Sequence, residues 1–414
     1  MNYAKKTFTG LAWVSASRGA ARFGTVIKIL ILARLLTPAQ FGLFGIAALV
    51  LSLLEIITET GINVFLIQEK AGLEEYLDTA WITSIIRGCV ISVLLLVGAY
   101  PISRFFDSPG AVNLILLASL VPLIRGFINP AVVSLQKTLR FSREFGIKAV
   151  IAAVEVITAV VVGLATMSAI ALVWSMVASA VAEVLITWLF ITPRPKVFWN
   201  KSQFLTIVGR GKWVTLAGLF NYLFQEGDDI AVGKLVSSTG LGLYQTAYKI
   251  AILPLSEITD AFGRVTFPIY STISTDLPRL RRAFFKTALA ICGLTLPVSL
   301  VIFLIPGTII TLLLGPSWVE AAPALRILAI FGLIRSVSNS SFALFLAVKK
   351  QVLVTAVTLV SFFGLALTVV PLVWAYGLEG AAFSALLGSL AALPIVGLGL
   401  MQVLFPTRQD PPSL

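Results

Sequence analysis

The chain has 414 residues, of which 58% are hydrophobic and only 12% are charged, and its formal net charge is +12. Together with a mean hydropathy of +0.98, this composition excludes a water-soluble protein, which needs more charged side chains to cover its surface. Apolar runs of roughly 20 residues recur along the whole chain, so we expect an all-α integral membrane protein without a large soluble domain.

The apolar runs predict about twelve membrane-spanning helices, because a helix that rises ~1.5 Å per residue needs ~20 residues to cross a ~30 Å hydrocarbon core. In chain order the predicted spans are residues 11–36, 39–59, 79–100, 111–135, 147–166, 168–192, 213–236, 241–265, 287–314, 321–348, 352–375 and 380–405. Cys89 and Cys292 both lie in these runs and predict no disulfide or metal site.

Basic residues lie inside the spans of the first half. Arg18 and Arg22 are four residues apart in the first span, so they share one helix face. Arg125 lies about 14 residues into the fourth span, roughly 21 Å along the helix, which is too deep for easy access to water. Such arginines face a cavity or pair with acids, and Glu155 and Glu183 are the acids that the structural alternative would use.

Residues 192–212, "TPRPKVFWNKSQFLTIVGRGK", are basic and contain two prolines. This composition predicts a cytoplasmic linker with an interfacial segment at Phe198 and Trp199. The expected domains are an N-terminal six-helix lobe at 1–192, the linker at 193–212 and a C-terminal six-helix lobe at 213–414.

Acidic residues mark the start of the second half. The stretch "FQEGDDIAVGK" places Glu226, Asp228 and Asp229 in the seventh span, beside Gly227, where local unwinding would expose backbone carbonyls to an ion. We therefore predict a coupling site for a cation or a proton, and a proton would have to use carboxylates because the chain has no histidine. The alternative is that these acids pair with Lys249 or Lys234.

Two segments of the first half reappear in the second. "ARLLTPAQFGLFGIA" at 33–47 resembles "GKLVSSTGLGLYQTA" at 233–247, and "LIRGFIN" at 123–129 resembles "LIRSVSN" at 333–339. The second pair puts Arg335 at the depth of Arg125. Two parallel six-span halves with a shared cavity between them are therefore predicted, and the repeated turns are interpreted as helix caps with close-packing glycines.

Lysine and arginine are concentrated in one set of loops, since the opposite set holds only Arg34, Arg104 and Lys234. The asymmetry predicts that both termini are cytoplasmic. It also accounts for the net charge, so no nucleic-acid partner is expected.

Several of these stretches resemble one known family. "LARLLTPAQFGLFGIAALV", "ETGINVFLIQE", "DDIAVGKLVSSTGLGLYQTAYKIAILPLSEI" and "FPIYSTIS" are similar to the polysaccharide and O-antigen flippases of the multidrug, oligosaccharidyl-lipid and polysaccharide exporter superfamily. The resemblance implies two six-helix lobes in a V around a central cavity. It also implies that an undecaprenyl-diphosphate-linked oligosaccharide moves from the cytoplasmic to the outer leaflet of a bacterial inner membrane, with a polysaccharide polymerase as an expected partner.

A diphosphate favours a basic cavity, because guanidinium groups bind phosphate oxygens two at a time. The predicted substrate-binding residues are Arg18, Arg22, Arg125, Arg335 and Lys249. The predicted ion-coupling residues are Asp229, which matches the family's recurring aspartate, Asp228 and Glu226. No catalytic residue, metal or cofactor other than the coupling cation or proton is expected.

Three other functions remain open. A lipid II flippase shares the mechanism but differs in cargo. A multidrug or cation exporter would need an acidic, aromatic-lined cavity, against which the deep arginines argue. A membrane glycosyltransferase or polymerase would need catalytic carboxylates in a large loop, whereas the longest loops, of roughly 20 residues, are basic.

Overall fold

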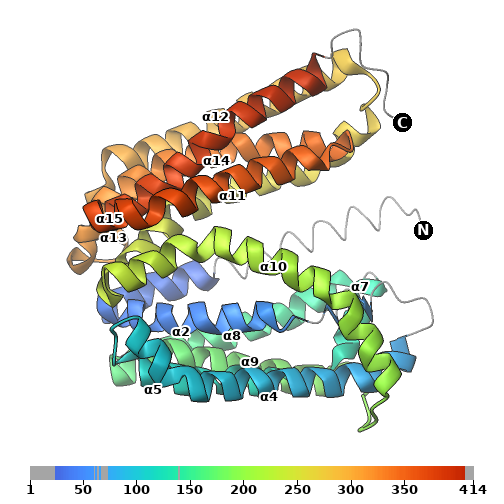
Figure 1. The fold of residues 1–414 in the computed structure, drawn as a ribbon. Helices are drawn as coiled ribbons and strands as arrows, with labels where there is room; N and C mark the ends of the chain where they lie inside the picture. The colour runs from blue at the N-terminus through green and yellow to red at the C-terminus, as the bar shows by residue number, and fades with distance from the viewer. Residues whose placement is uncertain (1–23, 60, 63–64, 67–72, 139, 406–414) are drawn as a thin grey trace. The chain divides into compact units, whose positions relative to one another are not determined.

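A computed structural model shows the fold (Figure 1) and describes residues 24–59, 61–62, 65–66, 73–138 and 140–405. Secondary structure in these residues is helical, without a strand. The chain forms two compact units, Met1–Glu226 and Gly227–Leu414, and their boundary falls inside a helix. The predicted all-α class is confirmed.

The first unit is a bundle in which α4 packs against α5 and α6, α6 packs against α9, and α8 packs against α9. Its helices are residues 24–35, α2 (Pro38–Ile57), α4 (Leu73–Phe105), α5 (Ala111–Ala118), α6 (Leu120–Arg125), η1 (Pro130–Val133), α7 (Ser134–Lys137), α8 (Phe141–Thr166), α9 (Ile170–Phe190) and most of α10 (Lys201–Leu235).

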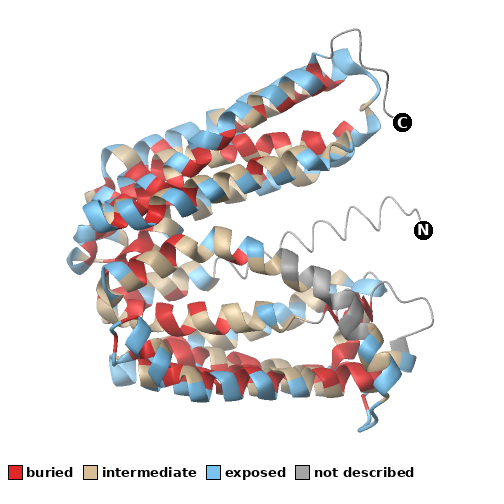
Figure 2. Ribbon diagram, in the orientation of Figure 1, coloured by how far each residue is buried: buried red, intermediate tan, exposed pale blue. Residues whose placement is uncertain are grey.

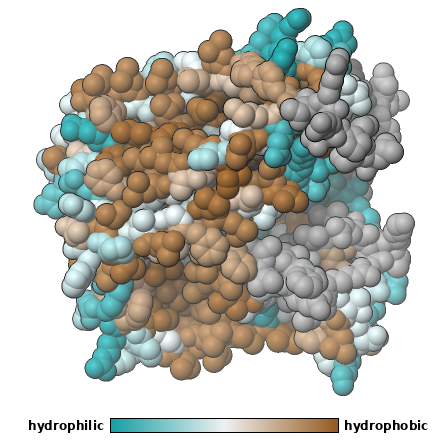
Figure 3. Space-filling model, turned by 45° about the horizontal axis from the view of Figure 1, so that its top comes forward, coloured by the Kyte–Doolittle hydropathy of each residue, from teal (hydrophilic) through white to brown (hydrophobic). Residues whose placement is uncertain are grey.

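The outer faces of these helices are exposed (Figure 2), and they carry many large hydrophobic side chains. On α8, Ile157, Val161 and Leu164 are each more than half exposed, and their spacing of four and three residues puts them on one helix face. Apolar residues also cover much of the surface in Figure 3. Exposure of so large an apolar surface to water is unfavourable, so these faces lie against lipid.

The repeated turns are helix caps in both halves, as predicted. The Thr37 side chain accepts from the Gln40 N–H while the Gln40 side chain accepts from the Thr37 N–H, which completes a capping box before α2. Before α11 (Ser238–Thr272), the Ser237 hydroxyl accepts from the Gly240 N–H at 3.0 Å. Each cap supplies partners for backbone groups that lipid cannot satisfy.

The predicted fourth span, 111–135, is broken directly after Arg125. The axis bends by 70° between residues 111–125 and 130–137, because Pro130 starts a new 3-10 turn and has no N–H with which to continue the old helix. Asn129 holds the break, since its side chain caps Ala131 and donates to the carbonyls of Ile191 and Pro193.

Helix α10 begins at Lys201, inside the predicted linker, where the Asn200 side chain accepts from the Ser202 N–H at 2.9 Å. It continues through Gly227 to Leu235, so the predicted unwinding at Gly227 is wrong. One helical glycine costs only ~1 kcal/mol relative to alanine, less than unpaired backbone groups cost in a membrane. The predicted lobe limits of 1–192 and 213–414 stay a prediction.

The second unit is centred on α14, which packs against α11, α12 and α15. Its further helices are α12 (Leu277–Leu304), α13 (Pro306–Leu313), η2 (Pro316–Ala321), α14 (Ala322–Ala347) and α15 (Gln351–Leu404). Although α15 runs for 54 residues, Gly377 has a φ of 57° and divides it into two helices. A Cβ at Gly364 would lie 2.8 Å from the Cα of Gly388, so the two helices fold back and touch through glycines.

By length and composition, seven described helices qualify as membrane spans, or eight with the bent pair around α6 and α7. This number counts α15 once, although its two halves match two predicted spans. It omits α10 and α11, which are long enough at 35 residues each but carry several charges. A multi-pass membrane protein is therefore confirmed, while the number of twelve spans stays a prediction.

Candidate functional site

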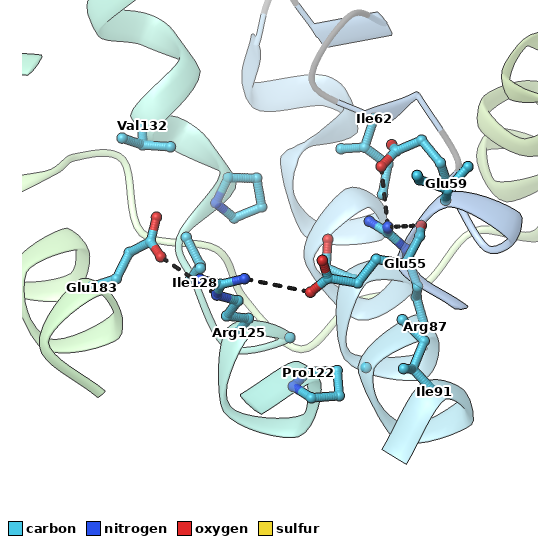
Figure 4. Close-up of a pocket in the computed structure, with 15 residues that line it drawn as sticks. Glu55, Glu59, Ile62, Arg87, Ile91, Pro122, Arg125, Ile128, Val132 and Glu183 are labelled. Atoms are coloured by element: carbon cyan, nitrogen blue, oxygen red, sulfur yellow. Dashed lines mark hydrogen bonds and ion pairs between the residues drawn. The ribbon is translucent and has the colours of Figure 1, made fainter. Parts of the chain in front are cut away.

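The first unit contains a cavity of about 430 Å³ among membrane-spanning helices. Charged side chains from α2, the residues directly after it, α4, α6 and α9 line it (Figure 4). These are Arg87, Arg125, Glu55, Glu59 and Glu183. Charges so far inside a membrane protein are costly, and their convergence on one cavity is typical of a substrate or ion pathway.

Arg87, on α4, is held at the C-terminal end of α2. Its Nη2 donates to the carbonyl of Glu55 and lies 3.1 Å from Oε2 of Glu59, and its Nε donates to the hydroxyl of Thr58 at 3.3 Å. The last carbonyls of a helix have no partners inside the helix, so a guanidinium stabilises this end. A quarter of the Arg87 side chain remains exposed, and the residue lines the cavity.

Arg125, on α6, lies between two carboxylates. Its Nη1 is 3.4 Å from Oε1 of Glu55, and its Nε is 4.0 Å from Oε2 of Glu183. Both distances exceed those of a good charge-assisted hydrogen bond, and the Arg125 side chain is 38% exposed. The guanidinium is therefore attracted to both carboxylates but makes no tight hydrogen bond to either, so it can rebind to an anion that enters the cavity.

Glycines bring the two arginines together. A Cβ at Gly88 would lie 2.3 Å from the carbonyl oxygen of Pro122, and a Cβ at Gly126 would lie 3.1 Å from the Cα of Ile85. The backbones of α4 and α6 therefore touch at the residues that directly follow Arg87 and Arg125. Any larger residue would push the arginine-bearing helices apart.

The lining carries two arginines and three glutamates, a formal excess of one negative charge. This balance differs from the basic cavity that a diphosphate alone would favour. It suits a site in which the arginines exchange carboxylate partners for an anionic ligand, because their charge is already compensated when the site is empty of ligand.

A separate ion pair joins Lys28, on helix 24–35, to Glu155 on α8. The Lys28 side chain is only 11% exposed, and neither residue lines the cavity. This pair corresponds to the structural alternative, in which a basic residue inside a span pairs with an acid and holds two helices together.

The second unit buries Asp228 and Asp229 on α10. Oδ2 of Asp228 accepts from the Tyr244 hydroxyl at 2.7 Å, and Oδ2 of Asp229 accepts from Nε2 of Gln245 at 2.9 Å. The two aspartates are 3% and 9% exposed. Among the described residues, no group of three or more acids, cysteines or histidines is arranged to hold a metal ion.

Arg335, on α14, belongs to the same network. Its Nη1 donates to the Tyr248 hydroxyl at 2.6 Å, and its guanidinium lies 5.7 Å from the centre of the Phe331 ring. The ring of Tyr248 lies 6.3 Å from that of Tyr244, which donates to Asp228. Two tyrosines thus connect the buried aspartate with the arginine.

The predicted site residues fall into four groups. Arg125 lines the cavity of the first unit, and Arg335 joins Asp228 and Asp229 in the second unit. Glu226 is half-buried on α10, and Lys249 is exposed on α11. Arg18 and Arg22 lie outside the described residues. Their roles in binding or coupling stay predictions.

Sequence reasoning missed Arg87, Glu55 and Glu59 as site residues, and it named Glu183 only as an acid with which an arginine inside a span could pair. One signal was present, because the tripeptide Ile-Arg-Gly occurs at both 86–88 and 124–126. In each copy the glycine makes the helix contact and the arginine reaches the cavity. No comparable local signal marks the glutamates.

Comparison with known proteins agrees with this architecture. Residues 31–323 match the model of a family described as "Polysaccharide biosynthesis protein". The lipopolysaccharide biosynthesis protein WzxC of Escherichia coli is 24% identical, over 84% of this chain and 71% of that protein. The teichuronic acid biosynthesis protein TuaB of Bacillus subtilis is also 24% identical, over 83% of this chain and 71% of that protein.

Solved structures share the fold. The inward closed structure of the lipid II flippase MurJ has a TM-score of 0.77 at 12% identity and covers 93% of this chain and 87% of its own. An inward-facing multidrug transporter of the MATE family has a TM-score of 0.72 at 17% identity, with coverage of 94% and 96%. Identities this low show the fold alone.

The family match covers well over half of the chain, and the relatives and structural neighbours named for an activity are transporters or flippases rather than enzymes. The predicted family resemblance is thereby confirmed: the chain belongs to the family described as "Polysaccharide biosynthesis protein".

Proposed function

We propose that this chain moves a lipid-diphosphate-linked oligosaccharide from the cytoplasmic to the outer leaflet of a bacterial inner membrane by alternating access. The observation that carries the proposal is the cavity in which Arg87 and Arg125 lie inside membrane-spanning helices. A diphosphate must cross a medium in which bare charge is very costly, and fixed guanidinium groups offset that cost.

Binding would proceed by exchange of partners. When the diphosphate enters, Arg125 releases Glu55 and Glu183 and turns to phosphate oxygens, while Arg87 stays anchored to the end of α2. The freed carboxylates then need a new positive partner, so substrate binding favours uptake of a proton or cation at the same cavity. Release of the substrate restores the original pairs.

Coupling to an ion gradient is proposed for the second unit, at Asp228 and Asp229. Two adjacent buried carboxylates create a strong local preference for a proton or a cation. The hydrogen bonds from Tyr244 and Gln245 hold both carboxylates in place. Membrane lipids surround the protein, and a polysaccharide polymerase is the expected downstream partner.

Both termini are proposed to be cytoplasmic, on the evidence of the loop charges. The lipid II cargo remains an alternative because the MurJ fold is shared. The excess of carboxylates in the cavity favours a second candidate function, export of an organic cation.

Purified protein in proteoliposomes separates these functions. Flipping of a fluorescent lipid-diphosphate sugar is measured by the protection of its label from a membrane-impermeant quencher, and uptake of a fluorescent organic cation is measured in parallel. We expect flipping with the parent protein and its loss in Arg125→Gln. Cation uptake without flipping would overturn the proposal in favour of the exporter.

A further inference from the structure

A second cavity, of about 600 Å³, lies away from the charged one, at the end of the first unit where α7 meets α8 and α9. Its lining is apolar except for Arg143. The floor includes Leu135 and Ile191, which belong to a buried hydrophobic cluster. Its rim includes Val150 and Phe190, which are 52% and 73% exposed and face the lipid side.

The groove has the polarity of a membrane lipid. Arg143 is the third residue of α8, and Val150 lies seven residues deeper, ~10 Å along the helix axis. Arg143 thus places a cation at one end of the groove, and apolar side chains line the groove farther along α8. A diacyl lipid presents the same order, with its phosphate at the interface and its chains beneath.

Two arginines at this end have no side-chain partner among the described residues. Arg140, at the N-cap of α8, and Arg143 make no side-chain hydrogen bond or ion pair within the part of the chain that the structure describes, and both are exposed. The nearby acid, Glu144, is already engaged by Lys148 and by the side chain of Gln136. Two guanidinium groups therefore remain available to an anionic headgroup.

Gly146 opens the groove between the headgroup end and the rim. A Cβ placed on Gly146 meets no atom within 4 Å, although the residue lies inside α8 and lines the cavity. A glycine inside a helix destabilises that helix, and here no close helix-helix contact compensates for the loss. The absence of a side chain at Gly146 instead leaves space for a hydrocarbon chain to lie across the helix backbone.

We propose that this groove binds one anionic phospholipid, with its phosphate on Arg143 and Arg140 and an acyl chain over Gly146. The lipid would fill the wedge between α8 and α9 and fix this end of the unit at the membrane surface. The proposal does not depend on the cargo of the transporter, since it concerns a surface outside the charged cavity.

Native mass spectrometry of the full-length protein tests it. The probes are a phosphatidylglycerol and a phosphatidylcholine with the same acyl chains, each titrated into delipidated protein. We expect one phosphatidylglycerol to survive activation that removes the phosphatidylcholine. In Arg143→Gln its retention should weaken about fivefold, as expected for one lost cation near an anionic lipid. Equal retention of both lipids by the parent protein would overturn the headgroup assignment.

A size series at Gly146 tests the groove. Gly146→Ala should keep the lipid, whereas Gly146→Leu fills the space and should lose it. Gly293→Leu, at another glycine with open surroundings, and Arg282→Gln, at another exposed arginine, are the matched controls and should bind like the parent. If Gly146→Leu does not fold, Val150→Trp blocks the rim instead. Unchanged retention in a folded blocking variant would contradict the proposal.

A competing occupant has its own signature. If undecaprenyl diphosphate displaces phosphatidylglycerol at equal concentration and Gly146→Leu abolishes its binding, the groove belongs to the isoprenoid carrier and the phospholipid assignment is wrong. If the carrier binds but neither displaces phosphatidylglycerol nor responds to Gly146→Leu, the phospholipid assignment is supported.

Discussion

Arg125 and Arg335 stand at the same place in the two repeats of this chain, but their surroundings differ. Arg125 lies beside a cavity between Glu55 and Glu183, at distances of 3.4 and 4.0 Å. Arg335 donates to a neutral phenol at 2.6 Å and stacks near Phe331, with no ion pair among the described residues of the second unit.

A repeated sequence motif thus places an arginine at the same position in both halves, but it does not determine which groups that arginine contacts or what it does. Arg125 is attracted to acids that an anionic ligand can replace, so it is suited to contact the substrate. Arg335 donates to Tyr248, whose ring lies near that of Tyr244, the donor to buried Asp228, so it is suited to sense the protonation or ion occupancy of that aspartate. Each prediction below tests one side of this contrast.

The largest effect is expected from Gly88→Ala, which disrupts the close contact between α4 and α6 beside the cavity that Arg125 lines. Its Cβ would lie 2.3 Å from a backbone carbonyl, so α4 and α6 must separate. The free energy of unfolding should fall by about 1 to 3 kcal/mol, the range typical of overpacking. Thermal unfolding and folded yield measure it. Gly146→Ala, where a Cβ meets open space, should match the parent, and equal behaviour of the two variants would disprove the close contact.

The next effect is on transport. Arg125→Gln should reduce flipping at least about tenfold, because phosphate loses a charge-assisted, two-pronged partner, while Arg125→Lys should retain part of the rate. Folded yield should fall modestly, since Glu55 and Glu183 are about one-third exposed and water screens them.

A triple variant separates the two roles of Arg125. Arg125→Gln combined with Glu55→Gln and Glu183→Gln removes the stranded acids and should recover the folded yield but not the flipping. Recovery of both would show that Arg125 serves only to balance charge. An unchanged rate in folded Arg125→Gln would remove it from the substrate site.

In the second unit, Asp229→Asn should abolish the dependence of flipping on an ion gradient while the protein stays folded, because an amide can still accept from Gln245. The measurement is flipping with and without an imposed pH or sodium gradient. Tyr244→Phe, which removes the donor to Asp228, should weaken the dependence without abolishing it. If flipping by Asp229→Asn still depends on the ion gradient as in the parent, the aspartates have only a structural role. The proposed difference between a substrate site in the first unit and a coupling site in the second would then be wrong.

The last test changes no activity and concerns orientation. In a background with Cys89→Ser and Cys292→Ser, cysteines at Ser202 and Ser274 should be protected from an impermeant thiol reagent in intact cells, whereas a cysteine at Ser317 should react. The loop charges are the reason. Labelling of Ser202→Cys from outside the cell would show that the predicted orientation is wrong and that the termini face outward.

The sequence by itself determined the membrane class, the approximate limits of most helices, the capped repeated turns and the family. These depend on composition and on contacts between residues close in the chain, which hydropathy and capping rules describe. It also indicated that Arg125 and Arg335 lie deep in spans, because depth follows from the count along one helix.

Only the tertiary structure decided what surrounds those charges. The partners of Arg125 come from α2 and α9, about 60 to 70 residues away along the chain, and no local pattern specifies which acid turns toward it. The break after Arg125 and the continuity of α10 through Gly227 were also decided by packing. A proline or glycine makes a kink inexpensive, but the neighbouring helices determine whether it occurs.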